Sequence, residues 1–199
     1  MKAAPGQAAA RVFVAVSVDA GLKHAIQRLQ EQLGEPCGKH VVRWVKPEQL
    51  HLTLKFFGNV GVDQFPELSN ALRCACQGVT AFRLAIGGLG CFPSLQRPSV
   101  IWLGVSGEVE ILGKLQKDIG LATNAFGDHS EVREFSPHLT IGRVKAAGHE
   151  ARQAGLVIRN TPVGEIGSWD VPGVELIQST LSPEGSSYRQ LASVPFAGH

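Results

Sequence analysis

The tetrapeptide HLTL spans residues 51–54, and a near copy, HLTI, spans residues 138–141. A turn-forming segment precedes each copy, Lys46-Pro47-Glu48 in the first case and Phe135-Ser136-Pro137 in the second. From the amino-acid composition, chance alone predicts about 0.04 occurrences of a His-apolar-Thr-apolar pattern. Two copies are therefore hard to attribute to chance, and the repetition indicates a site that is built twice.

The residues around each copy predict a β-strand, over 50–57 and over 138–144. Alternate residues of a strand share a face, so the His and the Thr of each copy point to one side and the two apolar residues point to the other. Burial of the four apolar side chains, at about 1.5–3 kcal/mol each, would hold both polar pairs in register. We therefore expect two imidazoles and two hydroxyls to face one cleft.

The apolar periodicity predicts the other elements. Strands are expected over 11–18, 41–45, 82–86, 99–105, 165–179 and 187–195, and helices over 20–33, 63–77, 108–126 and 149–155. Hairpin-like neighbours are frequent, and the order of elements repeats after residue 107. The sequence therefore predicts an α+β fold with mostly antiparallel sheets in two similar halves. We expect residues 1–10 to form a flexible leader and residues 11–199 to form a single domain.

Composition and charge exclude several classes of protein. The chain has 199 residues, of which 44% are hydrophobic and 18% charged, which is unlike a disordered chain. A net charge of +2 is too small for extensive wrapping of a nucleic-acid duplex. The apolar run over 12–18 is too short to span a bilayer, and residues 1–10 lack the apolar stretch of a secretory signal, so a cytoplasmic location is expected. The four cysteines form no CxxC pair, which disfavours a metal site or a disulfide.

Two imidazoles in one cleft can work as a general base and a general acid, because an unperturbed imidazole titrates near pH 6.5. Thr53 and Thr140 can donate hydrogen bonds to phosphate oxygens, and Arg143 can neutralise charge in a bidentate manner. This set of groups suits a phosphodiester substrate. A metal site is the competing interpretation, but no Asp or Glu lies at motif spacing to complete one. A single His-x-Thr would more often be a surface pair, and the duplication favours catalysis.

Strand geometry decides whether two basic residues, Lys55 and Arg143, lie on the same face as the histidines. Strict alternation places Lys55 on the face of His51, where it either contacts phosphate or is an exposed strand lysine, and it places Phe56 on the core face. The same alternation places Arg143 opposite His138. A role for Arg143 in the cleft therefore needs a bulge or a strand end after Gly142.

The sequence resembles the two-histidine phosphoesterase superfamily, specifically the RNA 2',3'-cyclic phosphodiesterase (2'-5' RNA ligase-like) family. Besides both His-x-Thr motifs, the similar segments are 11–16, 43–47, 55–58, 102–104, 136–143 and 179–188. The resemblance implies two pseudo-symmetric lobes with helices on their outer faces and a central, positively lined cleft. It also implies that no metal takes part. We further expect a monomer that works without a cofactor.

The resemblance further implies hydrolysis of a 2',3'-cyclic phosphate at an RNA end, or in a small cyclic nucleotide, to the 2'-phosphate. In this interpretation His138 activates water and His51 protonates the departing 3'-oxygen, although the two roles can be exchanged. Thr53, Thr140 and Arg143 would stabilise the developing charge. Two alternatives stay open, namely 2'-5' RNA ligation at the same site and a non-catalytic module that binds RNA ends.

Overall fold

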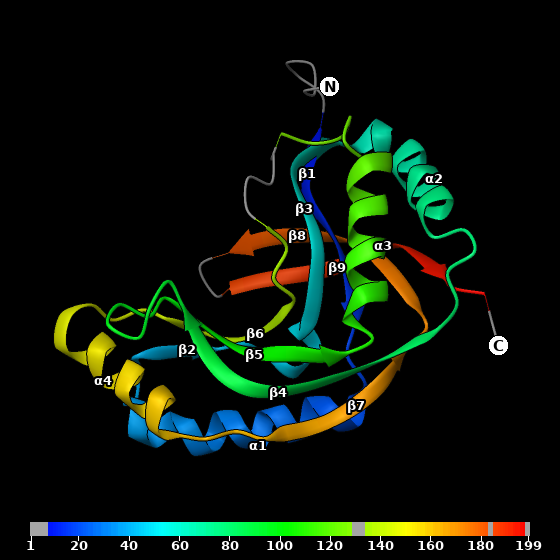
Figure 1. The fold of residues 1–199 in the computed structure, drawn as a ribbon. Coiled ribbons are helices and arrows are strands. Elements are labelled where there is room, and N and C mark those ends of the chain that lie inside the picture. Colours follow the sequence, from blue (N-terminus) through cyan, green and yellow to red (C-terminus); the bar gives the residue numbers. More distant parts are fainter. Residues whose placement is uncertain (1–7, 129–133, 183–184, 198–199) are drawn as a thin grey trace.

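The computed structural model describes residues 8–128, 134–182 and 185–197, and most of the predicted leader, residues 1–7, lies outside them (Figure 1). The first strand begins at Ala9, two residues before the predicted position. The strands are β1 (Ala9–Ser17), β2 (Val42–Trp44), β3 (His51–Gly61), β4 (Phe82–Phe92), β5 (Val100–Gly107), β6 (His138–Val144), β7 (Glu165–Val171), β8 (Gly173–Ser182) and β9 (Gly185–Pro195). The α-helices are α1 (Ala20–Cys37), α2 (Phe65–Ala75), α3 (Val109–Ala122) and α4 (Gly148–Asn160). No helix in the described ranges is long and apolar enough to cross a membrane.

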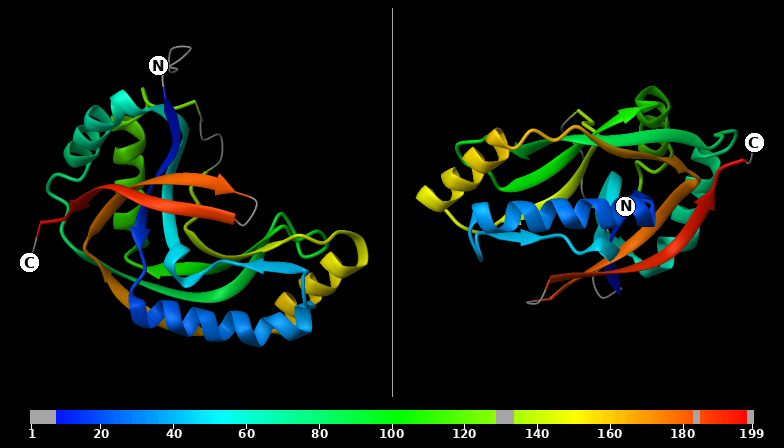
Figure 2. Two further views of the ribbon diagram at one scale, coloured as in Figure 1. Left: turned by 180° about the vertical axis from the view of Figure 1, so that it is seen from behind. Right: turned by 90° about the horizontal axis from the view of Figure 1, so that it is seen from below.

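Two antiparallel sheets form the two lobes. The smaller sheet has the strand order β3-β1-β8-β9, and the larger sheet has the order β2-β6-β5-β4-β7. Helices α2 and α3 cover the smaller sheet, whereas α1 and α4 cover the larger one (Figures 1 and 2). The predicted α+β fold, with antiparallel lobes and helices on their outer faces, is confirmed.

The lobes are not consecutive halves of the chain, which differs from the expectation of two sequential halves. Strands β1 and β3 pair with each other and lie in one sheet with β8 and β9, whereas β2, between them in sequence, joins the other sheet. Helix α1 follows β1 directly but packs on β2, β6 and β7 of the larger sheet. Sequence order alone does not reveal this exchange, because it depends on long-range strand pairing.

The apolar residues of both motifs lie in one continuous core. Leu52 and Leu54 are 1% exposed, and Leu139 and Ile141 are fully buried, which confirms the predicted inward face of each motif strand. The same core includes Leu22 and the other predicted apolar positions of α1. Both motif strands are thus anchored by packing on the side opposite their polar residues.

Several element boundaries differ from the predicted ones. Helix α1 continues past Gly34 and includes Pro36 in its last turn, and it ends at Cys37, where Gly38 follows with φ of 93°. Helix α4 is longer than the predicted 149–155, since apolar contacts extend to the buried Ile158. The predicted strand over 165–179 is two strands, β7 and β8, separated by Pro172, which has no N–H to donate to a sheet.

Candidate active site

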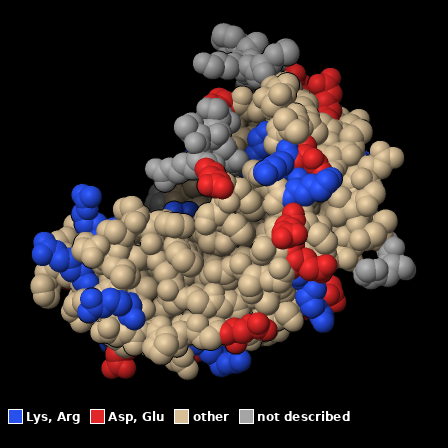
Figure 3. Space-filling model, in the orientation of Figure 1, with Lys and Arg blue, Asp and Glu red and all other residues tan. Residues whose placement is uncertain are grey.

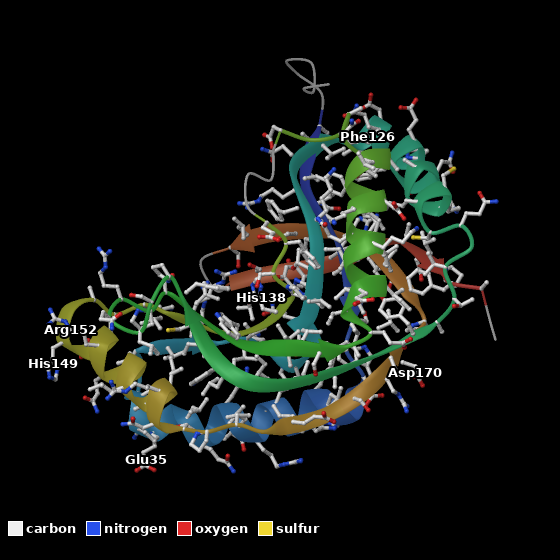
Figure 4. All side chains as sticks on the ribbon, viewed as in Figure 1. Glu35, Phe126, His138, His149, Arg152 and Asp170 are labelled. Atoms are coloured by element: carbon white, nitrogen blue, oxygen red, sulfur yellow. The ribbon has the colours of Figure 1, made fainter. Side chains whose placement is uncertain are left out.

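The site is a cavity of about 360 Å³ lined by residues from both sheets. The cavity brings together all five residues predicted for the site, which are His51, Thr53, His138, Thr140 and Arg143. Figure 4 shows His138 between the two sheets. Further basic and aromatic lining comes from β2 and the segment after it and from the β8–β9 hairpin, and includes Arg43, Trp44, Lys46 and Tyr188. Within the described part of the chain, no group of three or more His, Cys, Asp or Glu side chains could hold a metal ion.

The two histidines are oriented by equivalent hydrogen bonds. Nδ1 of His51 lies 2.6 Å from the carbonyl oxygen of Gln49, and Nδ1 of His138 lies 2.7 Å from that of Ser136. A carbonyl oxygen only accepts, so each Nδ1 carries the hydrogen. Each Nε2 is then free of a proton in the neutral ring and can accept one, or donate one after protonation. Both imidazoles are thus held in the tautomer that acid–base chemistry through Nε2 requires.

The turn before the first motif also joins the site to the β8–β9 hairpin. The side chain of Gln49 donates a hydrogen bond to the carbonyl oxygen of Ser186, while its own carbonyl accepts from His51. Both Gln49 and Ser186 line the cavity. One residue therefore fixes the His51 ring and the hairpin wall relative to each other.

Aromatic rings pack against each imidazole. The Phe13 ring stacks on His51 with a centroid distance of 4.7 Å, and Tyr188 meets His51 edge-on at 5.3 Å. On the other lobe, Phe92 meets His138 edge-on at 5.0 Å, and Trp102 lies 6.5 Å from it. No sequence pattern predicted these contacts, although Phe13, Trp102 and Tyr188 fall in the segments that carry the family resemblance.

Burial and nearby positive charge lower the proton affinity of His51. Burial is the main cause that lowers its pKa to about 4; the hydrogen bond to Gln49 acts in the opposite direction, and the positive charges of Arg143 and Lys23 add to the lowering. The imidazole of His51 is therefore neutral at pH 7 in the free protein. An anionic ligand beside Arg143 would offset part of this effect.

A β-bulge brings Arg143 to the cavity. Thr140 pairs with Trp102 and Gly142 with Ile101, so Ile141 is the extra residue on β6. The bulge shifts the alternation by one and returns Arg143 to the His138 side, where it lines the cavity. The predicted bulge is thus present, one residue earlier than the expected position after Gly142.

Hydrogen bonds from two other elements hold this bulge. The carbonyl oxygen of Ile141 accepts from the backbone N–H of Val45 at 2.9 Å and from Nε2 of Gln30 at 2.8 Å. Gln30 is buried in α1 and also donates to the carbonyl oxygen of Val45. The extra residue therefore leaves no unsatisfied carbonyl at this point of the strand.

An equivalent bulge lies in the first motif strand. Thr53 pairs with Ala15 and Lys55 with Val14, so Leu54 is the extra residue. The bulge corrects both expectations for the residues that follow it. Lys55 is buried on the helix side rather than beside His51, and Phe56 packs against Phe13 rather than in the main core. Both motifs thus carry a bulge at their fourth residue.

The buried ammonium group of Lys55 joins β3 to the C-terminal end of α3. Its Nζ donates to the carbonyl oxygens of Gly120 at 3.2 Å and Thr123 at 3.1 Å, and it lies 2.9 Å from the Thr123 hydroxyl. A positive charge is favourable at a helix C-terminus. Lys55 therefore stabilises the strand that positions His51 and Thr53, and it does not contact the cavity.

Comparison with known proteins identifies relatives of this chain. The model of the LigT-like phosphoesterase family matches residues 16–102. The RNA 2',3'-cyclic phosphodiesterase of Methanothermobacter thermautotrophicus is 36% identical over 181 residues, which are 91% of this chain and 96% of that protein. The protein of the same name from Archaeoglobus fulgidus is 32% identical over 183 residues, 91% of this chain and 97% of its own.

Solved structures share the fold. The crystal structure of TT0787 of Thermus thermophilus is 25% identical, with a TM-score of 0.79 over 94% of this chain and 98% of that one. Escherichia coli LigT complexed with 3'-AMP is 22% identical, with a TM-score of 0.71 over 96% of this chain and 99% of its own. The chain belongs to the LigT-like phosphoesterase family, as its two His-x-Thr strands predicted.

Proposed function

We propose that this protein hydrolyses a 2',3'-cyclic phosphate at an RNA end to the 2'-phosphate, by acid–base catalysis with His51 and His138. The observation that carries the proposal is the presence of two imidazoles in one cavity, each with Nδ1 bonded to a carbonyl oxygen and Nε2 left for chemistry. The names of the relatives, RNA 2',3'-cyclic phosphodiesterase, support the same reaction.

In the proposed reaction, a water molecule attacks phosphorus opposite the 3'-oxygen, and the bond between phosphorus and that oxygen breaks. One imidazole takes a proton from the water at Nε2, and the other gives a proton to the departing 3'-oxygen. Thr53, Thr140 and Arg143 stabilise the negative charge that develops on the non-bridging oxygens. The cavity also holds the basic residues Arg43 and Lys46, which suit an anionic ligand.

The low pKa of His51 bears on the assignment of the two roles. A neutral imidazole matches the protonation state that the base role requires, so His51 can act as the base and His138 as the acid, although the low pKa makes His51 a weak base. The opposite assignment, with His138 as the base, requires that the bound phosphate first raises the pKa of His51. Substrate binding beside Arg143 supplies an interaction of the right sign, so the assignment is a matter for experiment.

The test uses EDTA-treated protein and an RNA oligonucleotide that ends in a 2',3'-cyclic phosphate. We expect conversion to the 2'-phosphate, identified by its resistance to enzymes specific for 3'-phosphates. His51→Ala and His138→Ala should each reduce hydrolysis by at least about 100-fold. His24→Ala, at an exposed position of α1, is the matched control. Near-full activity of either site variant would refute the acid–base pair.

The same cavity could serve 2'-5' ligation, because a 5'-hydroxyl can take the place of water. An assay with a second RNA that carries a 5'-hydroxyl separates the two reactions. Tight binding of the cyclic phosphate end without any turnover would instead indicate a module that captures RNA ends. We also propose that the protein is a monomer, which sedimentation tests, and that it works without a cofactor, which the EDTA assay tests. We propose a cytoplasmic location, which cell fractionation tests.

A further inference from the structure

Phe92 is an exposed aromatic ring beside the site. Its side chain is 36% exposed, although the ring packs against Trp102 at 5.2 Å and meets the imidazole of His138 edge-on at 5.0 Å. Its backbone is held by Ser99, whose backbone N–H and hydroxyl donate to the carbonyl oxygen of Phe92 at 2.7 and 3.0 Å. Nothing in the proposed acid–base chemistry uses this ring.

The ring lies outside the cavity. The residues that line the cavity include His138 but not Phe92, and Phe92 meets the imidazole of His138 edge-on at 5.0 Å. A nucleoside cyclic phosphate has a single base. If the cavity holds that nucleoside, the base that reaches Phe92 belongs to another nucleotide.

Next to Phe92 lies a second aromatic residue, Trp102. Trp102 lies across Gly90 of the neighbouring strand, where a side chain larger than hydrogen would collide with the indole ring. Trp102 also lines a second cavity of about 480 Å³, together with Leu95, Arg159 and Thr161. Aromatic surface followed by a cation is the combination that single-stranded nucleic acid binds, through stacked bases and neutralised phosphates.

The charge on this side of the molecule fits an anionic chain. Lys and Arg side chains gather at the end of the molecule that carries α4 (Figure 3), and Arg152 lies there (Figure 4). Arg97, Arg152 and Arg159 are exposed, and within the described ranges no ion pair involves any of them. Arg159 belongs to α4 at this positive end and lines the second cavity together with Trp102.

We propose that Phe92, backed by Trp102, stacks the base of the nucleotide that precedes the cyclic phosphate. The substrate would then be recognised as an RNA end of at least two nucleotides, with the strand continuing toward Arg159. This inference rests on the proposed function, since it assumes that the cavity holds the terminal cyclic phosphate. It adds a position that determines specificity without taking part in the proton transfers.

The experiment compares three substrates, which are adenosine 2',3'-cyclic phosphate, the dinucleotide ApA with a terminal 2',3'-cyclic phosphate, and the same dinucleotide without its first base. Stacking predicts that kcat/KM for the full dinucleotide exceeds that for the other two by about 5- to 150-fold. Phe92→Leu should abolish this ratio and Phe92→Tyr should retain it. Leu121→Ala, at an exposed apolar position of α3, is the control and should show the wild-type ratio.

A binding measurement accompanies the kinetics. The dissociation constants of the dinucleotide 2'-phosphate and of its counterpart without the first base should differ in the wild-type protein and converge in Phe92→Leu. The proposal is overturned by equal values of kcat/KM for the three wild-type substrates, or by an unchanged ratio in Phe92→Leu. A loss shared equally by all three substrates would also overturn it, because the ring would then only position His138. If the wild-type protein hydrolyses none of them, the proposed function fails, and the binding comparison still decides the role of Phe92.

Discussion

Replacing Lys55 with Met tests whether the bulge after Thr53 gives this lysine a structural role. The substitution keeps the aliphatic stem beside the Phe57 ring, over which Nζ lies at 5.0 Å, and removes the charge. It leaves two carbonyl oxygens at the end of α3 and one hydroxyl without their ammonium partner. Hydrogen bonds to charged groups contribute about 1.5–3 kcal/mol each, and part of this is offset because a buried charge no longer has to be desolvated.

We therefore expect Lys55→Met to lower the free energy of unfolding by about 3 kcal/mol, which corresponds to a fall in Tm of roughly 6–12 °C for a chain of this size. Urea unfolding at pH 7, with an unchanged m-value, measures the effect. The matched control is Lys114→Met on α3, whose side chain is 79% exposed and pairs with Asp118, and which should cost less than about 0.5 kcal/mol.

Activity gives the second readout of the same variant. Below its unfolding transition, Lys55→Met should hydrolyse the cyclic phosphate with the wild-type kcat/KM, because Nζ points to the end of α3 and not to the cavity. Unchanged stability together with a large loss of activity would refute this reasoning. That result would mean that Lys55 contacts phosphate, as strict strand alternation allowed.

Three further predictions concern the site. Because the pKa of His51 is lowered from 6.5 to about 4, the unfolded chain binds more protons than the folded one between these values, so the free energy of unfolding should decrease as the pH falls through this window. The decrease should be smaller in His51→Asn, and identical pH slopes would contradict the burial of a neutral imidazole. A substrate with sulfur in place of the 3'-oxygen needs no proton on its leaving group, so it should restore hydrolysis to whichever of His51→Ala and His138→Ala lacks the acid. Rescue of both variants, or of neither, would count against the division of roles. Arg143→Gln should lower kcat/KM by about 10- to 150-fold through the loss of charge-assisted hydrogen bonds, whereas Arg28→Gln on the exposed face of α1 should match the wild type.

The sequence was a good guide to the residues inside each motif and a poor guide to those just after it. The period of two correctly predicted that Leu52 and Leu139 are buried behind their histidines. The same period failed for Lys55 and Phe56, because the bulge at Leu54 shifts the side chains after it to the opposite face until a second bulge at Phe57 restores the alternation. A bulge is set by how a strand pairs with its neighbour, so the strand's own pattern does not reveal it.

The surroundings of the histidines were harder to predict for a related reason. Tyr188 meets His51 from the far end of the chain, and Phe92 meets His138 from a strand that joins the site only through the sheet order. A sequence pattern describes neighbours along the chain and not those brought together by pairing. The family resemblance marked the segments that contain Trp102 and Tyr188, but it gave no reason for their presence.

The interleaving of the lobes has a consequence for how the protein is made. The smaller sheet contains the first strand and the last two, with β8 paired to β1 across most of the chain length. During synthesis, β1 and β3 are exposed long before β8 and β9 leave the ribosome, so the sheet that carries His51 is completed only after β4, β5, β6 and β7 of the larger sheet have emerged. Such long-range pairing slows folding. Neither lobe can be obtained by cutting the chain at one point, because strands of the larger sheet lie between β1 and β8 along the chain.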